Sequence, residues 1–299
     1  MARSEQQDRI KRLLPGKVLW VAIAVISCAV FALLHTLFSG VSADALIAQT
    51  GLAKTVEVTT AIVNSIPLNF DVPKDFQAKI IKDVPVIGTE KYIALTFDDG
   101  PWPETTEKIL ATLKQEKIKA TFYVIGQPLK SFPEIGKKVL ADGHVIANHT
   151  LHHWYKQMSP LVAQREIEDT AKIIKEVLNV ETAYFRPPGG VLTNGLVAYA
   201  LKHNQSVNMW SVDSGDSHPK RPSTAAILKT VLAGATPGGI VLMHDGGGRH
   251  DNTAKAVPQI IAQLRDRGYK FVTVPELLEL SSAAAATPTA QGSSTSVGS

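Results

Sequence analysis

The chain has 299 residues and a formal charge of +4, of which the first 17 residues supply +3. Because little net charge remains and no basic run interleaved with aromatic residues follows, we do not expect nucleic acid as a partner. The single cysteine, Cys28, lies in an apolar N-terminal segment, which excludes a disulfide framework and a thiolate metal site downstream.

The first predicted element is an apolar helix over residues 18–38, a stretch of 21 residues without Asp, Glu, Lys or Arg. At about 1.5 Å per residue it spans roughly 30 Å, the thickness of a bilayer core. The basic residues 1–17 are expected in the cytoplasm, so the pattern predicts a membrane anchor with the remaining chain in the periplasm or outside the cell. A cleaved signal peptide is the alternative, because residues 43–45 offer small side chains for cleavage, and the protein would then be secreted.

Residues 39–88 contain scattered prolines without clear periodicity, which predicts a stalk or linker. From residue 89 to residue 280, strand-like and helix-like patterns alternate and predict one folded domain. The predicted strands are 92–97, 121–125, 144–147, 183–185, 206–212, 240–243 and 270–274. The predicted helices are 105–117, 133–141, 160–178, 195–203, 223–233, 253–267 and 275–280. Residues 281–299 are small and polar, which predicts a disordered tail.

Seven strands that are each followed by a helix indicate an α/β fold with a parallel sheet and helices outside it. Length and repetition favour a distorted (β/α) barrel of seven or eight units, similar to a TIM barrel. An open doubly wound sheet is the alternative, although no glycine fingerprint for a dinucleotide follows the first strand.

Ionisable residues follow the C-terminal ends of five predicted strands, where barrel enzymes place their active sites. In chain order they are Asp98 and Asp99, the segment 148–153 with its histidines, Arg186, Asp213 and Asp216, and His244 with Asp245. We therefore expect one site at this end of the fold.

His149 and His153 are four residues apart, so on a helical turn both imidazoles would face one side and bind one divalent ion. The zinc-peptidase motif is absent, because Thr150 stands where that motif requires Glu. One aspartate after the first strand would complete a site of two histidines and a carboxylate, with open positions for water and substrate. The same ligand types suit iron in an oxygenase, so they do not decide the metal.

Asp98 and Asp99 follow a strand, and in a loop both side chains can turn into one pocket. One is then expected to bind the ion, and the other to accept a proton from the attacking water. Arg186 is expected to pair with the second carboxylate, because its planar guanidinium suits bidentate contact. His244 ends the apolar run IVLM and is expected to be a general acid. The competing interpretation for Arg186 is an ordinary surface arginine, and the one for His244 is a histidine buried in the core.

Five motifs in order resemble those of the polysaccharide deacetylase family, carbohydrate esterase family four. They are TFDDG at 96–100, HTLHH at 149–153, RPPGG at 186–190, WSVDSGD at 210–216 and LMH at 242–244. The resemblance implies that residues 89–280 form a distorted (β/α) barrel that removes N-acetyl, less often O-acetyl, groups from surface polysaccharides. It also implies a divalent cation, expected to be Zn²⁺, with Co²⁺ or another divalent ion as alternatives.

The resemblance further implies a role for each residue of the site. The implied metal ligands are Asp99, His149 and His153. The implied catalytic residues are the general base Asp98, its partner Arg186, the acid His244 and the aspartate that tunes this acid, Asp216. The implied substrate and oxyanion contacts are the backbone N–H near Gly189, Leu242 and Trp210.

Two positions depart from the family pattern. Ser217 follows Asp216 where the family usually has Trp, so one wall of the acetyl pocket is missing or comes from Trp210. Asp213 is then a rival to Asp216 for the tuning role. Gly189 stands where an aromatic residue is common, which is expected to open the cleft and leaves the preferred sugar undetermined.

The sequence therefore predicts a membrane-anchored, metal-dependent N-deacetylase that acts on peptidoglycan or a chitin-like polymer. The alternatives are an O-acetyl esterase of the xylan type and a catalytically silent glycan-binding module. An iron oxygenase is disfavoured, because such sites usually lie on all-β jelly rolls.

Overall fold

The computed structural model describes residues 67–86 and 89–285. The chain divides into two compact units, residues 1–68 and 69–299, and nearly all of the first lies outside the described residues. The predicted basic segment, the predicted anchor at 18–38 and most of the predicted stalk also lie outside them. Within the described ranges, no helix is long and apolar enough to cross a membrane.

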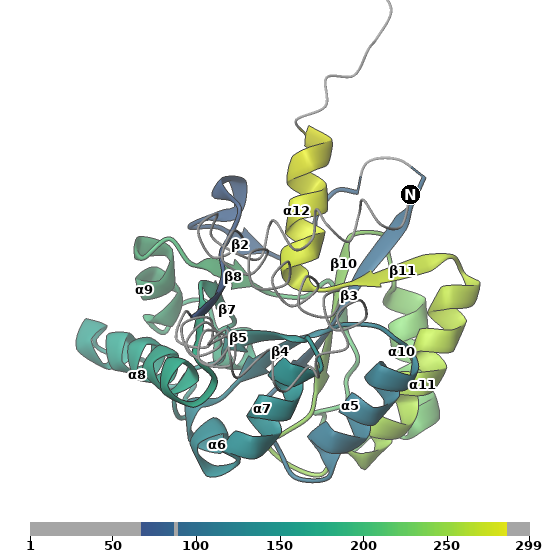
Figure 1. The fold of residues 1–299 in the computed structure, drawn as a ribbon, viewed down its shortest axis with the longest axis horizontal. Helices are drawn as coiled ribbons and strands as arrows, with labels where there is room; N and C mark the ends of the chain where they lie inside the picture. The colour runs from purple at the N-terminus through teal and green to yellow at the C-terminus, as the bar shows by residue number, and fades with distance from the viewer. Residues whose placement is uncertain (1–66, 87–88, 286–299) are drawn as a thin grey trace, which may run out of the picture. The chain divides into compact units, whose positions relative to one another are not determined.

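A curled parallel sheet of nine strands forms the centre of the fold (Figure 1). In spatial order the strands are β2 (Ile80–Ile81), β8 (Ser206–Asn208), β7 (Tyr184–Phe185), β5 (Val145–Asn148), β4 (Thr121–Val124), β3 (Lys91–Asp98), β10 (Gly239–His244) and β9 (Val212–Asp213), and β11 (Tyr269–Val272) also pairs with β3. The order of described strands runs from β2 to β9 without closing. The predicted parallel α/β fold is confirmed, but the sheet is an open half-barrel rather than a closed barrel.

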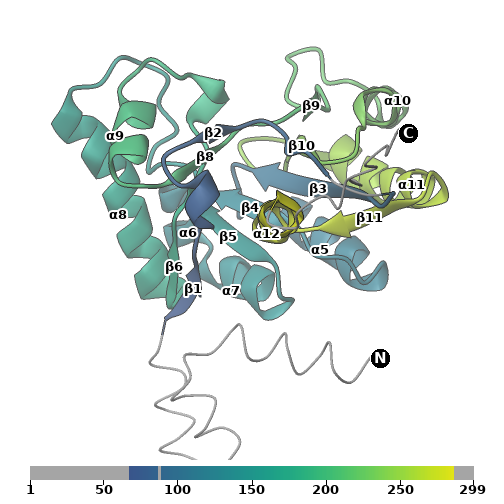
Figure 2. The same cartoon turned by 90° about the horizontal axis from the view of Figure 1, so that it is seen from above.

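Helices cover the outer side of the sheet, and α12 lies beside β3 on the other side (Figure 2). They are α5 (Thr105–Gln115), α6 (Gly126–Ser131), α7 (Pro133–Ala141), α8 (Pro160–Leu178), α9 (Leu196–Lys202), α10 (Thr224–Gly234), α11 (Asp251–Asp266) and α12 (Val274–Ala285). Helix α8 has its predicted bounds, because Ser159 accepts a hydrogen bond from the N–H of Val162 and Asn179 ends the helix with a left-handed φ of 52°.

Alternate residues of each strand face opposite sides of the sheet, which separates two packing layers. The inner layer joins the strands to α12 through Ala94, Tyr123, Ala147, Tyr184, Ile240, Val274, Leu277 and Leu278. On the outer side, Phe185 of β7 packs among residues of α8 and α9. Along β3 the inner row continues from Ala94 to Asp98, so the strand that fills the core also carries a carboxylate to the rim.

Several elements differ from the sequence prediction. The predicted strand 206–212 is two strands, β8 and β9, interrupted at residues 209–211. The described part of the predicted linker forms three elements: β1 (Leu68–Phe70), the 3₁₀ turn η1 (Lys74–Phe76) and β2. Strand β1 pairs with β6 (Val180–Thr182) in a separate two-stranded sheet. It also buries Val72, Ile81 and Val84 in the core. Helix α6 was not predicted, and α12 extends to residue 285, into the predicted tail.

Candidate metal and catalytic site

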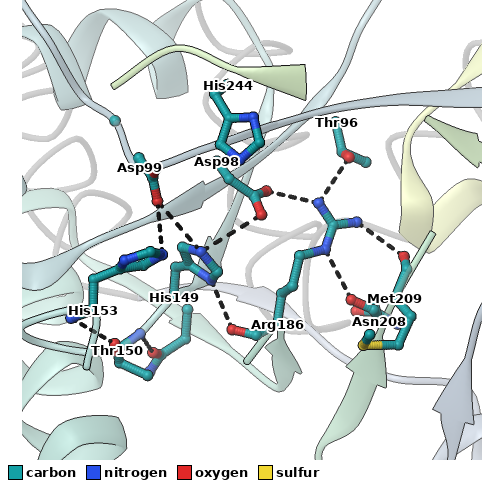
Figure 3. Close-up of polar contacts among 12 residues, drawn as sticks. Thr96, Asp98, Asp99, His149, Thr150, His153, Arg186, Asn208, Met209 and His244 are labelled. Carbon is teal, nitrogen blue, oxygen red and sulfur yellow. Dashed lines mark hydrogen bonds and ion pairs between the residues drawn. The ribbon is translucent and has the colours of Figure 1, made fainter. Parts of the chain in front are cut away.

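Two adjacent carboxylates lie at the C-terminal end of β3, and both point toward Nε2 of His149. Asp98 is the last residue of the strand and is almost fully buried. Asp99 has a φ of 75°, in the left-handed region that non-glycine residues rarely adopt. This turn breaks the strand alternation, so neighbouring side chains reach the same side, as the sequence predicts (Figure 3).

His149 and His153 lie against Asp99 (Figure 3). Oδ1 of Asp99 is 3.4 Å from Nε2 of His149 and 3.1 Å from Nε2 of His153, and the three potential ligand atoms all lie within 4.8 Å of one another. The predicted helical turn is wrong, because the segment is a loop in which Thr150 and His153 have φ values of 70° and 60°. The N–H of His153 donates to Oγ1 of Thr150, which fixes the loop.

The ring of His149 is held in the orientation that a metal ligand needs. Its Nδ1 lies 2.7 Å from the carbonyl oxygen of Arg186, so a neutral ring donates there and directs the Nε2 lone pair toward Asp99. Oδ1 of Asp99 is buried, and no described donor is placed to hydrogen-bond it. In this tautomer, Nε2 of His149 and Oδ1 of Asp99 are two acceptors 3.4 Å apart, an arrangement that a cation between them would stabilise.

The charge states of the other ligands agree with this arrangement. Burial, together with the charge of His149, lowers the pKa of His153 to about 4, so the ring is neutral at neutral pH. Burial raises the pKa of Asp99, but the hydrogen-bonding and charge interaction with His149 outweighs it and, with smaller contributions from His153 and His244, lowers the pKa to about 2. A neutral His153, the imidazole of His149 and an ionised carboxylate are ligand types that suit a divalent cation of the zinc type.

Arg186 is fully buried and pairs with Asp98 (Figure 3). Nη1 donates to Oδ1 of Asp98 at 2.7 Å. Contact with this carboxylate is through one nitrogen and not bidentate as predicted, because the remaining donors bind other groups. Their acceptors are Oγ1 of Thr96 and the carbonyl oxygens of Asn208 and Met209. The pair therefore lies in a fixed orientation, with Oδ2 of Asp98 3.5 Å from Nε2 of His149.

His244, at the end of β10, is paired with Asp216. Its Nδ1 lies 2.7 Å from Oδ1 of Asp216, whose other oxygen accepts hydrogen bonds from the backbone N–H of His244 and from Thr253. Burial lowers the pKa of His244, but the hydrogen bond and charge of Asp216, with smaller contributions from Asp98 and Asp99, raise it to about 9. Asp213 is exposed and accepts the N–H of Gly215 instead. The structure thus brings Asp216, and not Asp213, to the histidine.

The remaining predicted site residues lie around this cluster. Gly189 has a φ of 58°, and a Cβ placed on it would lie 2.6 Å from the ring of Tyr155. The space above Gly189 is therefore filled from another loop, so the expected opening of the cleft at this position is wrong. Trp210 packs on Gly190, with its ring 5.7 Å from the Arg186 guanidinium. Leu242 is buried in β10, two residues before the acid histidine.

Two buried carboxylates support the site through contacts that the sequence analysis did not predict. Glu166 of α8 accepts the N–H groups of Leu151 and His152 and lies 2.6 Å from Nδ1 of His152, so it anchors the histidine loop. No spacing signals this contact, because the partners lie on different elements. Asp245 accepts hydrogen bonds from Gly100 and Thr106, and burial raises its pKa to about 7. The sequence analysis placed Asp245 at this end of the fold, directly after His244, but assigned it no role.

Known proteins resemble this chain in sequence and in structure. The family model described as polysaccharide deacetylase matches residues 86–207. A peptidoglycan-N-acetylglucosamine deacetylase of Bacillus cereus is 38% identical over 194 residues, which cover 64% of this chain and 91% of the relative. A crystal structure of a peptidoglycan N-acetylglucosamine deacetylase with a bound N-oxidanyl-benzamide is 34% identical, with a TM-score of 0.64 over 69% of this chain and 94% of that one. A pseudoenzyme of the same esterase family from Bacillus anthracis is 28% identical, with a TM-score of 0.62 over 69% of this chain and 70% of that one.

Proposed function

Because the chain belongs to the polysaccharide deacetylase family and is a polysaccharide N-deacetylase, we propose that it uses a divalent cation to hydrolyse N-acetyl groups on a cell-wall or chitin-like glycan, releasing acetate. The observation that supports this proposal best is the cluster of Asp99, His149 and His153 within 4.8 Å, with the Asp98 carboxylate beside it. The name of the Bacillus cereus relative favours peptidoglycan N-acetylglucosamine as the substrate unit.

The proposed cation is Zn²⁺, with Co²⁺ or another divalent ion as alternatives, held by Asp99, His149 and His153. When bound, such a cation would polarise the acetyl carbonyl and lower the pKa of a water molecule. Asp98 is proposed to accept the proton of the attacking water. Arg186 keeps Asp98 in place, because its guanidinium is itself fixed by hydrogen bonds to the backbone carbonyl oxygens of Asn208 and Met209.

His244 is proposed to donate a proton to the departing amine nitrogen. Asp216 holds Nδ1, which leaves Nε2 as the atom that delivers the proton. The pKa of about 9 keeps the ring protonated at neutral pH, the state that a general acid needs. The backbone N–H of Gly189 is proposed to stabilise the developing negative charge on the acetyl oxygen, and Leu242 and Trp210 are proposed to border the acetyl group.

We also propose that the enzyme acts outside the cytoplasm, held to the membrane by the apolar segment 18–38. This part of the proposal rests on the sequence of that segment and on the location of the glycans that such enzymes deacetylate. Cleavage of the segment would give a secreted enzyme with the same site.

The alternative of a silent module calls for a direct test, because one structural relative is described as a pseudoenzyme. The full chain, loaded with zinc in detergent, is incubated with peptidoglycan fragments, N-acetylated chitin oligomers and acetylated xylan, and the products are analysed by mass spectrometry. Loss of acetyl groups from the first two classes is expected. Preference for acetylated xylan would indicate the O-acetyl esterase, and no acetate from any substrate would overturn the proposed reaction.

Three variants test the roles within that reaction. Asp98→Asn and His244→Ala are expected to lower deacetylation by about a hundredfold or more while zinc remains bound. Asp99→Ala is expected to lose both zinc and activity. Activity of Asp98→Asn equal to that of the unchanged protein would contradict the assignment of the base.

A further inference from the structure

An exposed aromatic ring borders the candidate metal cluster. Tyr155 lies on the loop between β5 and α8, two residues after His153. It is 58% exposed, the largest exposed fraction among the large hydrophobic side chains that the structure describes as exposed. Burial of such a ring stabilises a fold, so a ring left open beside a catalytic site is a candidate for contact with a ligand.

The ring of Tyr155 spans two loops of the site. On one side its edge meets the His153 imidazole, with the ring centroids 5.1 Å apart and the planes at 81°. On the other side it lies directly over Gly189, where an added Cβ would be 2.6 Å from Cε1 and 3.0 Å from Cδ1. The ring therefore connects a predicted metal ligand to the glycine whose N–H is proposed to contact the acetyl oxygen.

The neighbouring aromatic residue, Trp154, is packed differently from Tyr155. Trp154 stacks on His152 at a centroid distance of 4.5 Å, and the Lys156 ammonium lies 3.7 Å from the centroid of the same ring. Trp154 is thus occupied by two partners within its own loop. Tyr155 makes an edge contact with His153 and packs on Gly189, and among the described residues its hydroxyl has no hydrogen-bond partner.

We propose that Tyr155 is a substrate-positioning residue that stacks on a pyranose ring of the N-acetylated glycan next to the reacting acetyl group. The C–H face of a pyranose is apolar and packs on an aromatic ring, while the tyrosine hydroxyl can bond a sugar hydroxyl. This proposal rests on the proposed function, because it assigns the glycan-binding side of the same site. Tyr155 acts on binding and orientation and takes no part in proton transfer.

The test compares Tyr155→Ala and Tyr155→Phe with Leu161→Ala, a control that removes a side chain 56% exposed on α8. The zinc-loaded full chain is assayed with the N-acetylated chitin pentamer and dimer. Tyr155→Ala is expected to raise KM for the pentamer about fivefold or more, to change kcat less, and to affect the dimer less. Tyr155→Phe is expected to keep most of the affinity, and Leu161→Ala all of it.

A binding measurement separates this proposal from the proposed reaction. In an Asp98→Asn background, calorimetry with the pentamer is expected to show the same loss of affinity when Tyr155 is replaced by Ala, whether or not the unchanged protein deacetylates that substrate. Equal pentamer affinity with Tyr and Ala would overturn the proposal. Loss of zinc from Tyr155→Ala would also overturn it, because the ring would then serve only to support His153.

Discussion

The guanidinium of Arg186 is fully buried, and one carboxylate, Asp98, balances its charge. Removing one partner of such a pair leaves the other charge without compensation in a medium of low polarity. We expect Arg186→Met to lower the free energy of unfolding by roughly 3–5 kcal/mol, measured by urea denaturation. The double variant Asp98→Asn with Arg186→Met should lose less than the single one. A loss below about 1 kcal/mol for Arg186→Met would show that this pair is not isolated from water.

The pairing of His244 with Asp216 predicts a specific dependence of activity on pH. The protonated ring is the acid, so kcat/KM should fall as the pH rises through the pKa of about 9. Asp216→Asn removes the negative charge that raises this pKa, so the fall should begin about one to two pH units lower. A bound cation would lower the pKa in both proteins, so the difference between them is the measured quantity.

Asp213→Asn is the matched control for this pH profile, because Asp213 is exposed and, within the described part of the chain, its side chain accepts only the N–H of Gly215. Its profile should coincide with that of the unchanged protein. If the alkaline limb moved with Asp213→Asn and stayed in place with Asp216→Asn, the tuning role would belong to Asp213, the rival that the sequence left open.

At the level of elements, two glycines precede strands in similar conformations but in different surroundings. Gly238 before β10 has a φ of 80°, and a Cβ there would lie 1.8 Å from the carbonyl oxygen of Val84. Gly268 before β11 has a φ of 83°, and a Cβ there would meet no atom within 4 Å. We expect Gly268→Ala to cost about 1 kcal/mol from backbone strain alone, and Gly238→Ala roughly 3 kcal/mol or more from the added clash.

Thermal or urea unfolding of both glycine variants provides the comparison. The N–H of Val84 also donates to the carbonyl of Gly238, so the clash would displace the segment that leads to β3. Equal losses for the two variants would mean that this segment moves aside freely, and that the described part of the predicted linker contributes little to the stability of the fold.

The boundaries of elements show where sequence patterns were sufficient. Helix α8 was predicted at both ends, because its proline start and cap are local signals. The strand over 206–212 was predicted as continuous, but residues 209–211 belong to neither β8 nor β9, and the carbonyl of Met209 accepts a hydrogen bond from Arg186. The spacing of His149 and His153 indicated proximity correctly but the wrong backbone, since few non-glycine residues adopt a left-handed φ and Thr150 gives no sequence signal for it.

Across the whole molecule, the sequence indicated which strands would carry polar residues to one rim, because a parallel sheet aligns its C-terminal ends. It could not indicate that β2 would add an edge strand or that the sheet would stay open, since both depend on packing between distant segments. Contacts between residues on different elements could not be predicted from the sequence either. Glu166 on α8 anchors the histidine loop, and Tyr155 covers Gly189, in both cases through tertiary packing without a motif.

The proposed cation would join the loop after β3 to the loop after β5, so its binding should stabilise the whole fold. A ligand that binds only the folded protein stabilises it by about 2.7 kcal/mol at a concentration one hundred times its dissociation constant. We expect zinc to raise the Tm of the metal-free full chain and chelation to reverse the rise. Asp99→Asn, which removes the carboxylate ligand with little change in volume, should show almost no response to zinc. A response equal to that of the unchanged protein would mean that zinc binds elsewhere in the chain and that the cluster of Asp99, His149 and His153 is held together without an ion.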